Sequence, residues 1–251
     1  MKSFAIAILK RLILDFYFDL IYWYLFFRIT KAPPPNGKRN ILIINHVFDQ
    51  DIEALQLANR EFNFIVFNAA ILRFIPAQIF PAEVESYIAY NRPSMAPLKR
   101  RYRKVIDRFT KRLIKKYRLV AVISPSDNFF YVRELIPALH EHGVPYYVVD
   151  KEGTICPAYF THFAEYIKNN CPLIADHILV WSERQRAFWE KAGVSAQKIT
   201  VVGQPRSDFW KQEERWKEKT NLRISGLRPE AKLLLFFTYD PWAYTPDYMI
   251  A

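Results

Sequence analysis

Three apolar segments of the sequence each end in polar side chains that could carry acid–base chemistry. Residues 40–45, 119–123 and 145–150 have the length and composition of strands buried on both faces, which are typical of parallel sheets. Ligands of open parallel sheets bind beside the carboxyl ends of the strands, so polar groups placed there can converge on one site. The polar side chains at these three ends are His46, Asp49, Ser124, Ser126, Asp127, Asn128, Asp150 and Glu152.

These residue types suit a general base. A carboxylate or an imidazole held in a cleft can take the proton of a reacting hydroxyl group. We predict Glu152 as this base, with His46 as the alternative. The competing interpretation is structural, because a single acidic or histidine side chain at a strand end often caps a helix or pairs with a lysine.

Several other kinds of site are not expected. The sequence contains neither a GxGxxG nor a Walker A motif, which argues against a standard dinucleotide or P-loop site. The serine, histidine and aspartate residues show no nucleophile-elbow pattern. His140 and His142 are too isolated for a zinc site, and no DxD-like pair stands where a metal-dependent transferase needs it. We expect neither a metal nor a cofactor.

A phosphate-binding loop is predicted after the next strand–helix–strand unit. Residues 177–181 and 199–202 read as strands, with a helix between them that Ser182 caps and that ends at Gly193. Backbone N–H groups and a guanidinium can bind phosphate, and the residues that follow the second strand are Gly203, Gln204, Pro205 and Arg206. The structural alternative is that Pro205 fixes the turn and Arg206 pairs with Asp208.

The elements that position these groups predict an α/β fold, a Rossmann-like doubly wound parallel sheet. A further strand is expected at residues 62–67, and helices at 51–59, 97–118, 129–142 and 158–169. Residues 72–92 contain Pro76 and Pro81 without a dominant period, and we expect a short strand and a loop there.

The positive charge of the chain is concentrated in one helix. Residues 92–118 hold twelve Lys or Arg and one acid, which accounts for the whole net charge of +11. Apolar residues recur there every three or four positions, so one face should be buried and the rest basic. Attraction to an anionic membrane is the favoured interpretation, with nucleic acid and a merely solvated face as alternatives. The predicted membrane-contact residues are Lys99, Arg100, Arg103, Lys104, Lys111 and Lys115.

The N-terminal segment, residues 1–31, has the features of an interfacial helix. Residues 12–27 are apolar but contain Asp15 and Asp19, and 16 residues are fewer than a spanning helix needs. Basic residues bracket the Tyr22–Tyr24 aromatic cluster, and such aromatics favour the headgroup level. The segment should lie on a membrane or pack against the protein's own sheet. A Pro-rich linker follows at residues 32–38.

The run from Trp181 to Asp208 resembles the end of the N-terminal domain in GT-B-type glycosyltransferases of surface-polysaccharide biosynthesis. These enzymes are relatives of the CDP-glycerol glycerophosphotransferases and the UDP-GlcNAc 2-epimerases. The resemblance rests on Trp181-Ser182-Glu183, Gly193, Lys198-Ile199, Val202-Gly203 and Pro205-Arg206-Ser207-Asp208, with a weaker match at residues 149–153. Ser207 stands where the family often has an aromatic residue.

The resemblance implies an acceptor domain at residues 39–210, a linker helix and loop at 211–231 and the start of a truncated donor domain at 232–251. It also implies transfer from a nucleotide-sugar or CDP-polyol donor to a lipid-linked or polysaccharide acceptor, by metal-independent displacement at the cytoplasmic face of the membrane. Asp49, Ser124, Ser126, Asp127 and Asp150 would then lie on the acceptor side. Thr238 would join the Gly203–Arg206 loop in binding the donor. The alternatives are a UDP-sugar epimerase-like enzyme and a non-catalytic, membrane-associated binding or scaffold protein.

Overall fold

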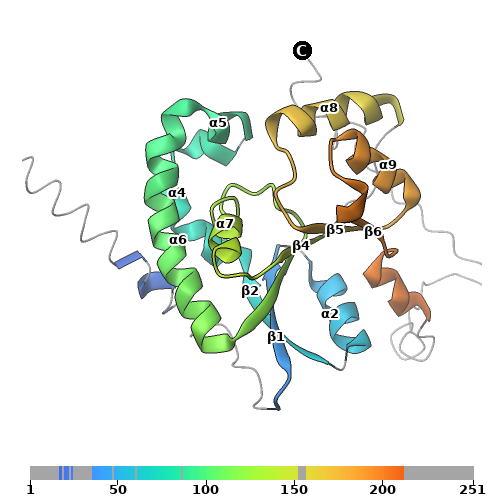
Figure 1. Ribbon diagram of the computed structural model, residues 1–251, viewed down its shortest axis with the longest axis horizontal. Helices are drawn as coiled ribbons and strands as arrows, with labels where there is room; N and C mark the ends of the chain where they lie inside the picture. The colour runs from blue at the N-terminus through green and yellow to red at the C-terminus, as the bar shows by residue number, and fades with distance from the viewer. Residues whose placement is uncertain are drawn as a thin grey trace, which may run out of the picture. The chain divides into compact units, whose positions relative to one another are not determined.

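The computed structural model describes residues 17–18, 20–22, 24, 36–46, 48–59, 61–85, 87–151 and 157–211 (Figure 1). The chain divides into two compact units, residues 1–209 and 210–251, and the sheet described here lies in the first. Glu152 and Thr238 lie outside the described residues, as does most of the 211–251 segment.

The centre of the fold is a six-stranded sheet in the order β2-β1-β3-β4-β5-β6, with every neighbouring pair parallel. The chain builds β2 on one side of β1 and then crosses to place β3 on the other, so the order switches direction between β1 and β3. This confirms the predicted Rossmann-like parallel α/β fold. The strands are β1 (Arg39–Asn45), β2 (Phe62–Asn68), β3 (Leu119–Ser124), β4 (Tyr146–Val149), β5 (His177–Val180) and β6 (Ile199–Val201).

Helices connect the strands and cover both faces of the sheet (Figure 1). The α-helices are α2 (Asp49–Ala58), α3 (Ala69–Phe74), α4 (Pro76–Ile79), α5 (Tyr87–Asn91), α6 (Ala96–Tyr117), α7 (Leu135–His140), α8 (Phe160–Asn170) and α9 (Glu183–Lys191). Short 3-10 turns lie at η1 (Ala82–Glu85), η2 (Pro93–Met95), η3 (Pro157–Tyr159), η4 (Ala196–Lys198) and η5 (Pro205–Lys211).

Alternate residues of a strand point to opposite faces of the sheet, so they pack into two separate hydrophobic cores. On β1, Leu42 and Ile44 enter the large core, which α6, α7, α8 and α9 help to cover. Ile43 points to the opposite face, where it packs with Phe48 and Ile52 at the start of α2. Burial of the central strands on both faces therefore explains why they read as continuous apolar runs.

Helix α6 is the longest element, and its predicted apolar face is buried. Tyr102, Phe109 and Leu113 are at most 1% exposed. Two residues of the N-terminal segment join this core: Tyr22 is fully buried, with its ring 5.0 Å from that of Phe109, and Phe18 is 8% exposed. The described part of this segment thus packs against the domain. None of the described helices is both long and apolar enough to cross a membrane.

Two sequence predictions are wrong in detail. Residues 72–92 form α3, α4, η1 and α5 instead of a strand and a loop. The helix predicted at residues 129–142 is confined to Leu135–His140, because residues 129–134 form turns.

Candidate functional site

A cavity of about 380 Å³ lies at the carboxyl ends of β1, β3 and β4. Its position beside the switch in strand order is where ligands bind in open α/β sheets, and its size is at the lower end of the range of ligand pockets, roughly 300–1,000 Å³. Aromatic and aliphatic side chains form much of the wall. The described lining residues are His46, Pro125, Ser126, Asp127, Asn128, Phe129, Val148, Asp150, Lys151, Phe163, Ile167, Leu173, Phe188 and Trp189.

His46 enters this cavity directly from the end of β1. Its ring packs on Phe129 with the ring centroids 4.6 Å apart, and Phe129 is in turn stacked on Tyr131 at 5.2 Å. This aromatic stack restricts the imidazole, which is half-buried, to one wall. A restricted imidazole is the arrangement a general base needs, so His46 remains a candidate for that role.

Asp150 lies at the end of β4, and its carboxylate is oriented by α9. Oδ2 accepts hydrogen bonds from the Trp189 indole N–H at 3.2 Å and from the Gln185 side-chain amide at 3.4 Å. Gln185 is itself buried, and its Oε1 accepts from the backbone N–H of Trp181. Two side chains of α9 thus place the Asp150 carboxylate at the cavity wall.

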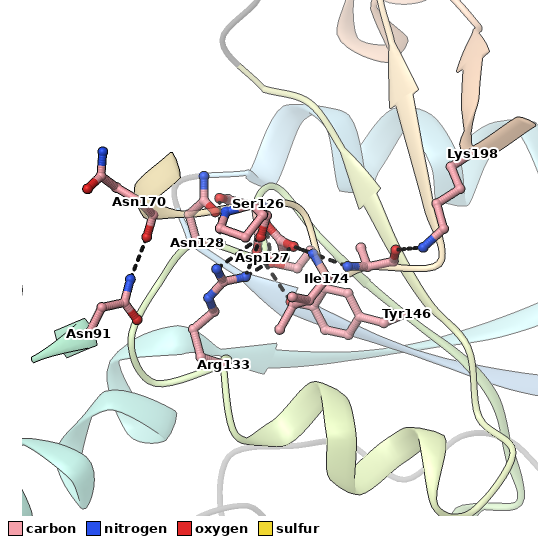
Figure 2. A network of polar contacts seen from close by, with 12 residues as sticks. Asn91, Ser126, Asp127, Asn128, Arg133, Tyr146, Asn170, Ile174 and Lys198 are labelled. Atoms are coloured by element: carbon pink, nitrogen blue, oxygen red, sulfur yellow. Dashed lines mark hydrogen bonds and ion pairs between the residues drawn. The ribbon is translucent and has the colours of Figure 1, made fainter. Parts of the chain in front are cut away.

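Asp127 has a different role, because its carboxylate forms hydrogen bonds and an ion pair within the protein (Figure 2). Oδ2 accepts from the backbone N–H groups of Ile174 at 2.6 Å and Ala175 at 3.1 Å, and it lies 3.5 Å from Arg133 Nη1. Burial raises the pKa of this carboxyl group, although the guanidinium and the backbone N–H groups act in the other direction. Arg133 also donates to the carbonyl of Pro172 at 3.0 Å. The network fastens the loop before β5 to the loop after β3.

The loop after β3 also contains an unsatisfied polar group. Ser124 Oγ donates to the Ser126 carbonyl at 2.8 Å, and Ser126 Oγ accepts from the Asn128 N–H at 3.0 Å. These local bonds stabilise the turn. Asn128 is 8% exposed and lines the cavity, yet its Oδ1 has no hydrogen-bond partner. A buried amide oxygen without a partner is costly, so this atom is suited to accept a hydrogen bond from a ligand.

Arg206 in the predicted phosphate loop is held by a buried carboxylate. Its Nη2 lies 2.7 Å from Asp51 Oδ2, and its Nε and backbone N–H each donate to Asp51 Oδ1 at 3.2 Å. The guanidinium also donates to the Lys151 carbonyl at 3.3 Å and lies 5.5 Å from the centre of the Trp181 ring. Asp51 is therefore an ion-pair partner that the sequence analysis did not name.

The remaining predicted residues lie near the rim. Asp49 is exposed and accepts from the Asn45 amide at 2.7 Å, across the β1–α2 junction. Gly203 has φ +80, a left-handed conformation that favours glycine. Gln204 accepts from the Ser207 hydroxyl, and Pro205 begins η5. The described lining residues include neither Asp49 nor residues 203–206.

The structure thus brings together five of the polar residues predicted at the strand ends in one cavity, namely His46, Ser126, Asp127, Asn128 and Asp150. Sequence reasoning did not identify Trp189, which is a partner of Asp150 in the structure. Among the described residues, no group of three or more His, Cys, Asp or Glu side chains could hold a metal ion.

Fold and cavity together define a Rossmann-like α/β domain with a ligand-sized pocket at its carboxyl rim. No family model matches the sequence, and no curated protein matches it. Similar solved structures are UDP-GlcNAc 2-epimerases. That from Methanocaldococcus jannaschii is 15% identical with a TM-score of 0.41, over 73% of this chain and 50% of the enzyme. That from Neisseria meningitidis, bound to UDP-GlcNAc, is 10% identical with a TM-score of 0.42, over 77% and 55%.

The chain spans about half the length of these enzymes. At identities of 10–15%, residue roles do not transfer from one chain to the other.

Proposed function

We propose that this chain is the acceptor-side domain of a transferase that moves a glycosyl or polyol-phosphate group from a nucleotide-activated donor to a lipid-linked or polysaccharide acceptor. The observation that carries this proposal is the cavity beside the β1–β3 switch, into which His46 and the oriented Asp150 project from separate strand ends. The family resemblance of residues 181–208 supplies the class of reaction.

The wall of the cavity suits a hydroxyl-bearing ligand. Phe129, Phe163 and Trp189 offer apolar surface, while Asp150 and the unsatisfied Oδ1 of Asn128 are hydrogen-bond acceptors. Acceptors of this kind favour a ligand that presents several O–H donors, as a saccharide or a polyol does.

In the proposed reaction, an acceptor hydroxyl oxygen attacks the donor and forms one new bond. For a nucleotide sugar, the anomeric C–O bond breaks and the nucleoside diphosphate leaves. For a CDP-polyol, the phosphoanhydride bond breaks and the nucleoside monophosphate leaves. The hydroxyl proton passes to a general base, for which His46 in the cavity is one candidate and Glu152 is the other. No metal or cofactor enters these steps.

Donor binding is assigned to the residues of the Gly203–Arg206 loop. The Arg206 side chain is 25% exposed and pairs on one side with Asp51. In this proposal, the other side of its guanidinium binds the leaving phosphates of the donor.

The test is turnover by the whole protein with UDP-GlcNAc or CDP-glycerol, with and without a polysaccharide or lipid-linked acceptor. Transfer releases nucleotide in an acceptor-dependent way. Loss of a general base lowers the rate by about 10²- to 10⁴-fold, so His46→Ala or Glu152→Gln should show a loss of that order. His142→Ala is the matched control, because His142 is exposed and does not line the cavity.

Three results would count against transfer. Conversion of the donor sugar to its epimer in the absence of an acceptor would indicate an epimerase in place of a transferase. Binding without turnover, unaffected by either variant, would favour the binding-protein alternative. An equal loss in His142→Ala would show that the effect is not specific to the cavity.

A further inference from the structure

We infer that one flank of the domain, formed by α6 and by the described N-terminal residues packed against it, docks on an anionic lipid bilayer. Figure 1 shows the described N-terminal residues beside α6, and the contacts of Phe18 and Tyr22 agree with this placement. The inference does not depend on the proposed reaction.

Helix α6 presents a continuous row of exposed cations, here called the basic stripe. Its members recur every three or four residues, so they share one face of the helix. The row spans 16 residues, and its two ends lie about 22 Å apart at the rise of an α-helix. The basic stripe consists of Arg100, Lys104, Arg108, Lys111 and Lys115.

Two of the predicted membrane-contact residues do not belong to this row. Lys99 lies with its ammonium 3.9 Å from the centre of the Tyr90 ring. Arg103 pairs with Asp107 at 2.5 Å and with Glu141 at 2.7 Å. Both side chains are half-buried, whereas those of the basic stripe are exposed.

The N-terminal segment adds apolar side chains to the same flank. Tyr17, Leu20 and Tyr24 are 53%, 37% and 58% exposed. They stand at helical spacing i, i+3 and i+7, on the face opposite to Phe18 and Tyr22, which are buried. We call these three exposed residues the tyrosine ridge. The Arg101 guanidinium, next to the stripe, lies 5.9 Å from the centre of the Phe18 ring and connects the described N-terminal residues to α6.

An anionic bilayer accounts for both features, whereas nucleic acid accounts for one. A row of cations is attracted to anionic headgroups, and tyrosine side chains favour the headgroup level of a membrane. Duplex nucleic acid would also attract the basic stripe, but it offers no apolar layer to the tyrosine ridge.

The experiment is sedimentation of the whole chain with vesicles of phosphatidylcholine alone and of phosphatidylcholine with phosphatidylglycerol. We expect binding to the anionic vesicles that weakens as salt is raised. Neutralising four members of the basic stripe (R100Q, K104Q, K111Q and K115Q together) should lower the partition coefficient at least about tenfold. Tyr17→Ser with Tyr24→Ser should lower it also at high salt, where the charge attraction is screened.

The matched control removes the same charge from exposed positions elsewhere, by K38Q, K168Q, R184Q and K191Q together. Circular dichroism shows that each variant is folded. The inference is overturned if the control loses as much binding as the stripe variant, or if neutral and anionic vesicles bind equally. Duplex DNA that displaces the protein from anionic vesicles at equal charge concentration would favour a nucleic-acid partner and overturn it as well.

Discussion

Removal of the Arg206 side chain should destabilise the domain far more than loss of a surface ion pair. Asp51 is 1% exposed, and Arg206 supplies its contacts at 2.7 and 3.2 Å. Loss of one partner from a buried pair costs about 3–5 kcal/mol, because the other charge stays buried without compensation. Arg206 is 25% exposed, and its backbone N–H still reaches Asp51 in a methionine variant. We therefore expect Arg206→Met to cost about 3 kcal/mol.

A double-mutant cycle separates this ion pair from general damage. In an Asp51→Asn background no charge is left behind, so Arg206→Met should cost about 1 kcal/mol, the value of an ordinary hydrogen bond. The difference, about 2 kcal/mol, is the expected coupling energy. Urea unfolding followed by circular dichroism measures each of the four free energies of unfolding.

Arg186 provides the control, because its pair with Glu190 at 3.1 Å is solvent-exposed on both sides. Arg186→Met should cost at most about 0.5 kcal/mol. The reasoning is refuted if Arg206→Met costs less than Arg186→Met, or if its cost is unchanged by Asp51→Asn. In that case Arg206 is not a structural clamp, and a loss of turnover in Arg206→Met would point to the donor phosphates.

Two further predictions concern buried ionisable groups. Burial raises the pKa of Asp127 above its ordinary 3.8, so the fold favours the protonated form and this group's contribution to stability declines as pH rises from 3.8 through the raised value. Asp127→Asn should therefore gain stability relative to the native chain over that rise in pH, as urea unfolding at several pH values will show; a constant difference would contradict this. Burial also raises the pKa of Cys171 to about 12. Cys156 is the other cysteine of the chain, and Cys156→Ser removes it. In that background, a thiol reagent should modify Cys171 in denaturant but not in the native chain at mildly alkaline pH. Rapid modification of the native chain would show that the site opens.

Strands and long helices could be predicted because the spacing of apolar residues in the local sequence indicates which faces are buried. Strand β1 is buried on both faces, and its sequence is accordingly a continuous apolar run. Helix α6 repeats its apolar residues with the period of a helix, and the side chains at those positions are the buried ones. The sequence also predicted the N-cap at Ser182, whose Oγ accepts a hydrogen bond from the Gln185 N–H at 3.4 Å.

Prolines explain the two errors in secondary structure. Pro76 was read as a break, but it stands at the first position of α4, where its missing N–H costs nothing. The short helices around it bury Leu72 and Ile75 without completing a recognisable period. Pro137 had the opposite effect. A helix begun at residue 129 would have placed it in the interior, whereas α7 begins at Leu135 and keeps Pro137 in its first turn.

The contacts of the candidate site were partly out of reach of the sequence. Strand ends can be predicted, and with them the convergence of His46 and Asp150. The carboxylate that pairs with Arg206 cannot be predicted in this way. Asp51 lies 155 residues away, and the local sequence pattern contains no information on that contact. The sequence offered the neighbour Asp208 as the partner, whereas the structure pairs the guanidinium with Asp51.

The loop after β3 connects the cavity to the proposed docking flank. Asp127 fastens this loop to the chain before β5 through Ile174, and Tyr102 of α6 donates its hydroxyl to the Tyr131 carbonyl at 2.8 Å. The Phe129 ring that packs on His46 belongs to the same loop. Because hydrogen bonds hold this loop on two sides, it loses little conformational entropy when a ligand binds. The cavity is therefore preformed. Helix α6 thus carries the basic stripe on one face and helps to fix the cavity wall with the other.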